Sequence, residues 1–523
     1  MTPVVADAVI AADAFPKPDI EYGLIAPILI VLGAAVAGVL IEAFLPRAVR
    51  RTLQLVVSLG GLAAAFVAVL VLADDDRSIV VEGALAFDGP ALFLQGTVLI
   101  LALAAFPLFA ERAVDGDRSG FAPSGAVLPG SAEERTLTQA RVEQTEVFPL
   151  AMFAVGGMLV FPAANDLLTV FVALEVLSLP LYLLCALARR RRLLSQEAAL
   201  KYFLLGSFAS AFFLYGAALL YGYAGSIGFA EIAAATQAGT GNDVYLAVGT
   251  AMIAVGLLFK VSAAPFHQWT PDVYQGAPTA VTAFMAACTK VAAFGALLRI
   301  FYVTLGGLRW DWRPMMWGVA ILTMVVGTVL ALTQTDMKRL LAYSSVAHAG
   351  FLLTGVVAAN ELGLQSTMFY LLVYGLATVG TFAIVMLVRD AGGEATHLSQ
   401  WAGLAKRSPI VASVFALFLL SLAGIPLTAG FVGKFAVFAA AIDGGAAPVA
   451  VVGVLMSAVA AFFYVRIIVL MFFSEPAPDG PTVVTPSVFA SASIALCAAA
   501  TVVLGVVPGP VLDLADKASV FLR

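Results

Sequence analysis

Long runs of apolar residues, separated by short polar stretches, dominate the chain. A helix needs about 20 apolar residues to cross the hydrocarbon layer of a bilayer. By this length criterion, the pattern of apolar runs predicts fourteen transmembrane helices. They lie at approximately residues 23–45, 53–73, 88–110, 147–163, 166–188, 197–223, 243–265, 276–302, 314–335, 337–358, 362–388, 409–442, 447–473 and 486–507. The predicted fold class is an all-α, polytopic membrane protein.

Two of these predicted spans contain residues that interrupt a helix. The twelfth span is too long for one straight crossing, and it contains Gly424, Pro426 and Gly430. The seventh span ends at Ala264-Pro265. Proline removes a backbone donor and its ring clashes with the preceding turn. We therefore expect broken helices at both places.

Two segments outside the spans have a different composition. The stretch 111–146 is polar, contains Gly, Pro and Ser, and carries both signs of charge. We expect a cytoplasmic loop there, either flexible or docked on a neighbouring protein. In residues 1–22, Asp7 and Asp13 precede any Lys or Arg. This order predicts a short exposed tail and not a cleaved signal peptide.

The composition agrees with a membrane protein and excludes two other classes. Apolar residues make up 62% of the 523 residues, and charged residues make up 12%. A chain of this composition is too apolar for an aqueous fold. The formal net charge of −5 argues against nucleic-acid binding, which needs a basic surface. Cys185, Cys288 and Cys497 lie far apart in apolar runs, so we interpret them as core residues and not as metal ligands.

The loop charges predict the orientation of the chain in the membrane. If residue 1 lies outside, the inner loops hold sixteen Lys and Arg residues, and the outer segments hold six. Positive residues concentrate on the cytoplasmic side of membrane proteins. We therefore predict that both termini lie outside.

Eight ionisable residues fall inside the predicted spans: Glu175, Lys201, Lys260, Lys290, Arg299, His348, Lys434 and Arg466. A charge at the centre of a bilayer is costly, so such residues usually mark an ion or proton path. The alternative is a side chain that extends back to the membrane surface. This alternative remains open for Lys201, Arg299 and Arg466. That alternative fits Glu175 and Lys290 poorly, because both lie in mid-span.

Lysine is preferred over arginine inside the spans. The chain has eight lysines and twenty arginines, but the spans hold four lysines and two arginines. Arginine keeps its proton, whereas a buried lysine can cycle between its charged and neutral forms. Lys260 precedes Pro265 by five residues and Lys434 follows Pro426 by eight. A broken helix frees backbone groups that can tune a nearby ammonium, although a kink that serves packing alone is the alternative.

Two histidines are secondary candidates. His348 has the hydroxyls of Ser344 and Ser345 about one turn before it, so it is either a proton relay or a satisfied core residue. His267 follows Pro265 and could connect Lys260 with water at the inner membrane face.

Several motifs resemble those of a known family. The segment 259–278, FKVSAAPFHQWTPDVYQGAP, resembles the signature of the antiporter-like membrane subunits of respiratory complex I (NADH:quinone oxidoreductase), and its part 269–276 is similar to the subunit N branch. Further similarities lie at 174–180, 338–345 and 421–426. The resemblance covers about residues 147–473. The first three spans and the last one fit in number only, and the insertion 111–146 is not part of the pattern.

The resemblance implies a domain organisation and a set of site residues. It implies two inverted five-helix repeats with broken helices, at 147–302 and 314–473. Before them lie the tail with three helices, 1–110, and the polar insertion, 111–146; the last helix and tail, 486–523, follow. It also implies a proton path through Glu175, Lys260, Lys290 and Lys434, with a Glu175–Lys260 pair; His348, Lys201 and His267 are secondary candidates.

The function implied by the resemblance is proton translocation without redox chemistry in this chain. No dinucleotide fingerprint, flavin site or cluster ligand set occurs in the sequence. NADH, FMN, iron–sulfur clusters and quinone are expected in partner subunits, and the partners are other membrane-arm subunits of complex I, both antiporter-like and small. A cation/proton antiporter subunit is the alternative. A pure scaffold and a metabolite transporter are less consistent with costly mid-membrane charges and with the lack of a polar substrate cluster.

Overall fold

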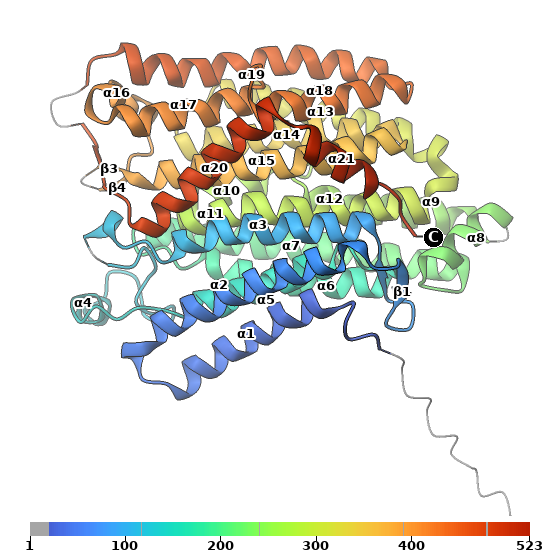
Figure 1. Cartoon of the computed structure of the whole chain (residues 1–523), viewed down its shortest axis with the longest axis horizontal. Coiled ribbons are helices and arrows are strands. Elements are labelled where there is room, and N and C mark those ends of the chain that lie inside the picture. The colour runs from blue at the N-terminus through green and yellow to red at the C-terminus, as the bar shows by residue number, and fades with distance from the viewer. Residues whose placement is uncertain (1–19, 117, 240, 391, 477–479, 523) are drawn as a thin grey trace, which may run out of the picture.

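The apolar runs fold as helices because a helix satisfies its own backbone hydrogen bonds, which the bilayer interior cannot do. The structure is a computed structural model that describes residues 20–116, 118–239, 241–390, 392–476 and 480–522. Most of the predicted tail, 1–19, lies outside these residues. Within them, long helices run side by side along one direction (Figure 1).

Each predicted span corresponds to a helix or to a pair of helices. Three helices come first: α1 (Ala26–Phe44), α2 (Arg47–Val71) and α3 (Gly89–Phe109). A first set follows: α5 (Val147–Val160), α6 (Leu167–Cys185), α7 (Arg192–Ala224), α9 (Asp243–Lys260) with α10 (Trp269–Gly276), and α11 (Thr279–Phe284) with α12 (Lys290–Arg299). A second set and a last helix complete the bundle: α13 (Arg309–Leu332), α14 (Met337–Ala358), α15 (Glu361–Leu387), α17 (Pro409–Ala423) with α18 (Ala429–Asp443), α19 (Ala447–Phe473) and α20 (Val488–Val506).

The prediction of a polytopic all-α membrane protein is confirmed. In the described part of the chain, twelve helical stretches are long and apolar enough to cross a membrane. The two further predicted spans are the shorter helix α5 and the interrupted pair α17–α18.

Both predicted helix breaks occur. Helix α9 ends at Lys260, and the chain resumes a helix only at Trp269. Helix α17 ends before Gly424, whose φ of 82° lies in the left-handed region that favours glycine. The eighth span has an irregularity that its sequence pattern did not predict, a π-helical turn at Met285–Thr289 directly before Lys290. Such turns widen a helix locally and are frequent at functional sites.

The two sets have the same order of elements, and each has its break in the fourth crossing. The first set begins at Val147, directly after the polar insertion. The second begins at Arg309, which lines a cavity together with α8 (Phe229–Ala238) at the opposite end of the bundle. Five crossings are an odd number, so the second set starts from the opposite side, as an inverted repeat requires.

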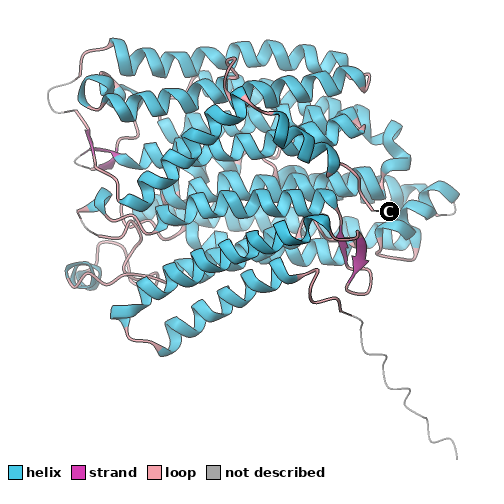
Figure 2. Ribbon diagram, in the orientation of Figure 1, coloured by secondary structure: helices cyan, strands magenta, loops and turns pink. Residues whose placement is uncertain are grey.

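The connections gather at the two ends of the bundle (Figures 1 and 2). One end carries α4 (Ala132–Gln139), α16 (Leu404–Arg407) and a small sheet of β3 (Val388–Asp390), β4 (Gly393–Glu394) and β5 (Thr482–Val483). The other end carries α8, the hairpin of β1 (Ser78–Val80) and β2 (Leu85–Phe87), and α21 (Gly509–Lys517). The short strands were not predicted. Helix α1 begins at the end of the bundle where the described chain stops, so the described part of the chain starts and ends at the same end.

The insertion 111–146 packs against its own bundle, which differs from the expectation of a flexible loop; docking on a neighbouring protein stays a prediction. Glu134 Oε1 accepts a hydrogen bond from Arg192 Nη1 at 2.5 Å, and both side chains are largely buried. Glu111 Oε2 accepts from the backbone and hydroxyl of Ser487 at 2.9 and 2.6 Å, at the start of α20. Phe121 stacks on Phe109 of α3. Specific pairs of polar groups therefore fix the segment, and composition alone could not show them.

The most buried helices lie in the centre of the bundle. The spans Thr279–Thr304 and Glu361–Leu387 are completely enclosed within their apolar windows, and Met337–Ala358 nearly so. Helices α1, α2, α19 and α20 are mostly exposed and apolar, as expected for surfaces that face lipid or partner subunits. The candidate residues can therefore be sorted by whether their helices are central or peripheral.

Candidate functional site

Lys260 ends the first half of a broken helix and is buried inside the bundle. Its Nζ donates to Ser178 Oγ at 2.6 Å and to Tyr202 OH at 3.3 Å. The ammonium also lies 5.2 Å from the centre of the Tyr202 ring, which stacks on Trp269 from beyond the break. Helices α6, α7 and α10 thus hold Lys260 with neutral groups only.

Glu175 lies three residues before Ser178 on α6, which is about one helical turn. Its side chain is partly exposed on the surface of the lone chain. It interacts electrostatically with Lys260, but the two form no ion pair within 4 Å among the described residues. The implied Glu175–Lys260 pair is therefore a longer-range interaction in this structure, and Ser178 occupies the contact position.

Lys290 follows the π-helical turn and is enclosed on all sides. Its Nζ donates to the backbone oxygen of Ser345 at 2.6 Å and to Ser345 Oγ at 2.7 Å. The same hydroxyl accepts from Tyr374 OH at 2.8 Å and lies 3.5 Å from Tyr274 OH. One serine on α14 therefore joins Lys290 to two tyrosines, one from α10 and one from α15.

His348 lies one turn further along α14 and contacts two other tyrosines. Its Nδ1 is 2.7 Å from Tyr370 OH, and its Nε2 is 3.2 Å from Tyr464 OH. Ser344 bonds to Tyr464. The two serine hydroxyls expected to serve His348 thus do not reach it directly. Ser345 binds Lys290, and Ser344 acts through Tyr464.

Lys434 lies beside the second break, on α18. Its Nζ donates to the backbone oxygens of Leu422 and Ala423 at 2.9 and 3.0 Å, and to Ser457 Oγ at 3.0 Å. These carbonyls belong to the last turn of α17, where an ended helix leaves oxygens without intrahelical partners. The break therefore builds the ligand shell of this ammonium, as the sequence pattern predicted.

These contacts form a series of separate buried polar clusters within an apolar bundle, which we call the row. Lys260, Lys290 and Lys434 are each at most 4% exposed. Hydroxyls of serine and tyrosine can both donate and accept, so they can pass a proton on by reorienting. The row is therefore suited to transferring protons. The sequence analysis did not identify the hydroxyl members: Ser178, Tyr202, Tyr274, Tyr370, Tyr374 and Tyr464. A signal was present, since hydroxyls in apolar spans need partners.

Two secondary candidates and one further cation lie outside this row. Lys201 is 43% exposed and pairs with Asp272 and Glu197, each at 2.8 Å. His267 lies half-buried in the first break, with its ring near that of Tyr343. Arg299 is completely buried and pairs with Asp88 at 2.6 Å, so it does not reach back to the membrane surface.

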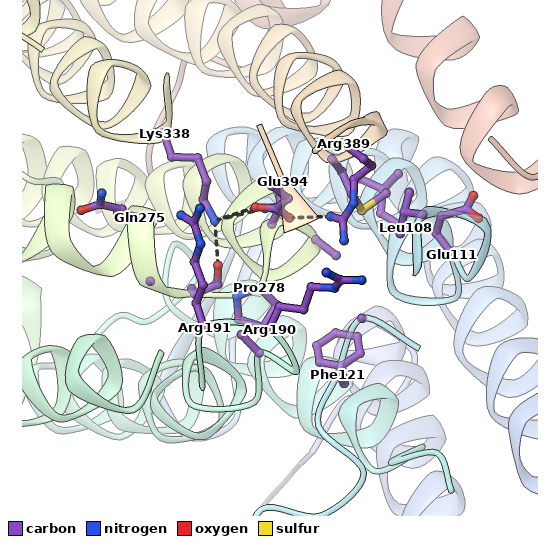
Figure 3. Close-up of a pocket in the computed structure, with 18 of the residues that line it drawn as sticks. Leu108, Glu111, Phe121, Arg190, Arg191, Gln275, Pro278, Lys338, Arg389 and Glu394 are labelled. Carbon is purple, nitrogen blue, oxygen red and sulfur yellow. Dashed lines mark hydrogen bonds and ion pairs between the residues drawn. The ribbon is translucent and has the colours of Figure 1, made fainter. Parts of the chain in front are cut away.

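A cavity of about 70 Å³ lies at the end of the bundle that carries the insertion (Figure 3). Lys338 on α14 forms part of its floor. Its Nζ donates to Ala277 O at 2.8 Å and Thr279 Oγ1 at 3.1 Å, and it lies 3.6 Å from Glu394 Oε2. Lys338 precedes Ser345 by seven residues, or about two turns of one helix face. The cavity therefore adjoins the helix starts that lead to Lys290.

No group suited to holding a metal, that is, no cluster of three or more His, Cys, Asp or Glu side chains, occurs in the described part of the chain. The three cysteines are buried and free.

Comparisons with known proteins agree on one family. The family described as NADH:quinone oxidoreductase/Mrp antiporter, TM, matches residues 164–477. A protein of Rhodococcus opacus named NADH-quinone oxidoreductase subunit N is 64% identical, over 97% of both chains. A chain of respiratory complex I from Thermus thermophilus is 34% identical with a TM-score of 0.75, covering 94% of this chain and 99% of that one. A chain of the Mrp complex from Dietzia is 23% identical with a TM-score of 0.79, covering 94% and 97%, and this shows a shared fold.

Proposed function

Since the chain belongs to the NADH:quinone oxidoreductase and Mrp antiporter family of membrane subunits, we propose that its buried lysine row carries protons across the membrane. The chain acts as a membrane-arm subunit of an NADH:quinone oxidoreductase. A full-length relative at 64% identity bears the name of that subunit, whereas the likeness to the Mrp complex rests on fold alone. The complex I function is therefore favoured over the antiporter alternative.

One observation carries the proposal: three buried lysines are bonded to neutral groups. Among the described residues, Lys260, Lys290 and Lys434 form no ion pair within 4 Å with a carboxylate. A buried ion pair would favour the charged form and hold the proton. Bonds to hydroxyls and carbonyls stabilise an ammonium less, so each lysine can release its proton to a neighbour. A scaffold has no need of this costly arrangement.

The contacts suggest an order of transfer. Protons enter at the end with the insertion and reach Lys290 along α11 and α14. From Lys290, protons pass by way of Ser345, His348 and the tyrosine hydroxyls to Lys434, across gaps that no hydrogen bond of the described residues spans, and leave on the outer side. Lys260 approaches the same group only through packed rings, Tyr202 on Trp269 and Trp269 on Tyr274, which carry no proton. Glu175 acts on Lys260 from a distance, because an opposite charge favours the ammonium.

The energy comes from outside this chain. Moving one elementary charge against 100 mV costs about 2.3 kcal/mol, and no redox group is bound by this chain in our proposal. NADH oxidation, FMN, the iron–sulfur clusters and the quinone belong to partner subunits. The partners are other antiporter-like and small membrane-arm subunits. The protein resides in the bacterial plasma membrane with both termini outside.

Lys434→Ala tests the proposal. In assembled complex in membrane vesicles, NADH-driven proton pumping should fall by at least about tenfold if the ammonium is a required step. Lys406→Ala is the matched control, because Lys406 is an exposed lysine paired with Glu475 at the bundle end. Normal pumping by Lys434→Ala in intact complex would refute the path. Proton movement driven by a sodium gradient, without NADH, would favour the antiporter alternative.

A further inference from the structure

Three side chains at the end of the bundle that carries the insertion form one hydrogen-bonded series. Thr279 Oγ1, at the start of α11, donates to Glu394 Oε1 at 2.5 Å. The same oxygen accepts from Lys338 Nζ of α14 at 3.1 Å. Lys338 Nζ also lies 3.6 Å from Glu394 Oε2, and Figure 3 shows these two side chains extending toward each other. One threonine hydroxyl therefore joins a carboxylate to an amine.

Exposure falls along this series from the carboxylate to the amine. The Glu394 side chain is 21% exposed, whereas that of Lys338 is 2% exposed. Thr279 is also buried. All three line the cavity of about 70 Å³, which has room for a small number of water molecules. A proton that arrives from water at this end therefore meets Glu394 first and Lys338 last.

The other charged side chains around Glu394 are fixed charges or are turned elsewhere. Arg389 Nη1 of β3 lies 3.6 Å from Glu394 Oε1, and Arg190 and Arg191 line the same cavity. Arginine keeps its proton. Glu111, the second carboxylate among the described lining residues, accepts a hydrogen bond from the start of α20 instead. The carboxylate, hydroxyl and amine of the series are therefore the groups here that can pass a proton on.

We propose that Glu394 takes up protons at this end and loads Lys338 through Thr279, an inference that rests on the proposed function. An opposite charge within about 4–6 Å favours the charged form of an ionisable group. When water delivers a proton to Glu394, the carboxylate becomes neutral, and the ammonium of Lys338 loses the charge that held its proton. Lys338 then releases that proton toward the interior of the bundle.

The hydroxyl of Thr279 completes the cycle, because a threonine hydroxyl can rotate and can both donate and accept. Neutral Glu394 gives its proton to Thr279 Oγ1, and the proton that Thr279 carried passes to the free amine of Lys338. One proton has then moved inward, and the carboxylate, hydroxyl and ammonium are restored. Lys338 precedes Ser345 by seven residues, roughly 10 Å along α14. No hydrogen bond of the described residues spans that distance, so the loading step ends at Lys338.

The test compares two replacements of Glu394 by NADH-driven proton pumping in membrane vesicles, normalised to assembled complex. Glu394→Gln keeps the size of the side chain and an oxygen that can accept from Thr279, but it cannot exchange a proton. Glu394→Asp keeps a carboxylate on a shorter side chain. Proton loading predicts that Glu394→Gln lowers pumping by at least about tenfold, whereas Glu394→Asp retains most of it. A merely structural role predicts the reverse order.

The deficit of Glu394→Gln should also grow as the pH rises. Without this carboxylate, protons reach Lys338 only by direct delivery from water, which slows as the hydronium concentration falls. The ratio of pumping by Glu394→Gln to pumping by the unaltered complex should therefore fall with increasing pH. The matched control is Glu475→Gln, because Glu475 is an exposed glutamate paired with Lys406 at the same end. This control should pump normally at every pH.

Two variants of Thr279 decide the question if Glu394→Gln assembles poorly. Thr279→Ser keeps the hydroxyl and should pump nearly normally. Thr279→Val keeps the shape of the side chain without the hydroxyl and should lower pumping several-fold. Equal pumping by these two variants overturns the loading route through Thr279.

The remaining outcomes separate this inference from the proposed function. Equal pumping by Glu394→Gln and Glu475→Gln, or a loss as large in Glu394→Asp as in Glu394→Gln, overturns the loading role of Glu394. Lys434→Ala is measured in parallel. If Lys434→Ala lowers pumping and Glu394→Gln does not, only the loading role falls. If neither variant lowers pumping, the proton path of the proposed function falls as well.

Discussion

Replacing Lys290 by arginine separates a proton relay from a fixed charge. The ammonium of Lys290 donates to both the backbone oxygen and the hydroxyl of Ser345. A guanidinium has two parallel N–H groups and can satisfy both acceptors, so Lys290→Arg preserves the charge and the bonds. The variant differs from the native chain mainly in that its side chain cannot release a proton.

The size of the effect follows from the acid strength of the two side chains. An arginine with a pKa above about 12 is neutral in at most about one molecule in 10⁵ at pH 7. A lysine in an apolar site can instead exchange its proton within turnover. If Lys290 relays protons, Lys290→Arg should lower pumping by at least about tenfold, as severely as Lys290→Ala. If Lys290 is only an electrostatic anchor, the arginine variant should pump nearly normally.

The assay is NADH-driven proton pumping in membrane vesicles, normalised to assembled complex. Lys406→Arg is the matched control, because it makes the same change at an exposed site. Lys290→Ala removes one donor from the backbone oxygen and the hydroxyl of Ser345 and leaves space in the core, so its assembly must be measured separately. A fully active Lys290→Arg complex would refute the relay role. A water-accessibility probe at the site distinguishes a blocked relay from a misfit of the wider arginine.

Three further outcomes follow from the contacts. Glu175→Gln should leave assembly normal and lower pumping several-fold. The control, Glu133→Gln on the exposed face of the insertion, should pump normally. Equal pumping by both variants would remove Glu175 from the path. Ser345→Ala should slow pumping at least several-fold, because it deletes the hydroxyl that joins Lys290 to the tyrosines; unchanged pumping in this variant would mean that protons bypass the hydroxyl. Burial raises the pKa of Glu134, but hydrogen bonds from Arg192 and a backbone amide outweigh this and hold the pKa below its ordinary value of 4.5. The docked state of the insertion, monitored by limited proteolysis, should thus be fully stable above about pH 4.5. It should weaken as the pH falls through the lower pKa that Glu134 has in the folded protein. Arg192→Gln should abolish most of that pH dependence.

The helices were predictable because each transmembrane span is marked by its length and hydropathy. The break near Lys434 was predictable because Gly424 and Pro426 are incompatible with a continuous helix there. The π-helical turn before Lys290 was not, since Met285–Thr289 has no residue that disfavours an ordinary α-helix. Packing against neighbouring helices produces that turn, and a single sequence does not contain the packing.

The charged members of the site were predictable, but their partners were not. A lysine inside an apolar run is conspicuous because burying it costs several kcal/mol. A serine or tyrosine in the same run is common, and burying it costs less free energy than burying a lysine. Ser345 lies 55 positions from Lys290, and only the fold brings them together. Hydroxyls were expected near His348 because Ser344 and Ser345 precede it in sequence, yet the tyrosines that bind it come from α15 and α19.

The distribution of carboxylates explains why some intramembrane cations are fixed and others are suited to move protons. Arg299 and Asp88 form a direct ion pair at 2.6 Å, with both side chains almost fully enclosed. Arginine cannot release its proton, and the paired carboxylate further stabilises its charged form. The Arg299–Asp88 ion pair therefore has a structural role. The three row lysines differ in both respects: they can be deprotonated, and their bonds go to neutral oxygens. The nearest acidic influence, Glu175, acts on Lys260 without contact. A partner subunit that approached the exposed side of α6 could shift Glu175 and thereby change the charge state of Lys260 without rebuilding the core.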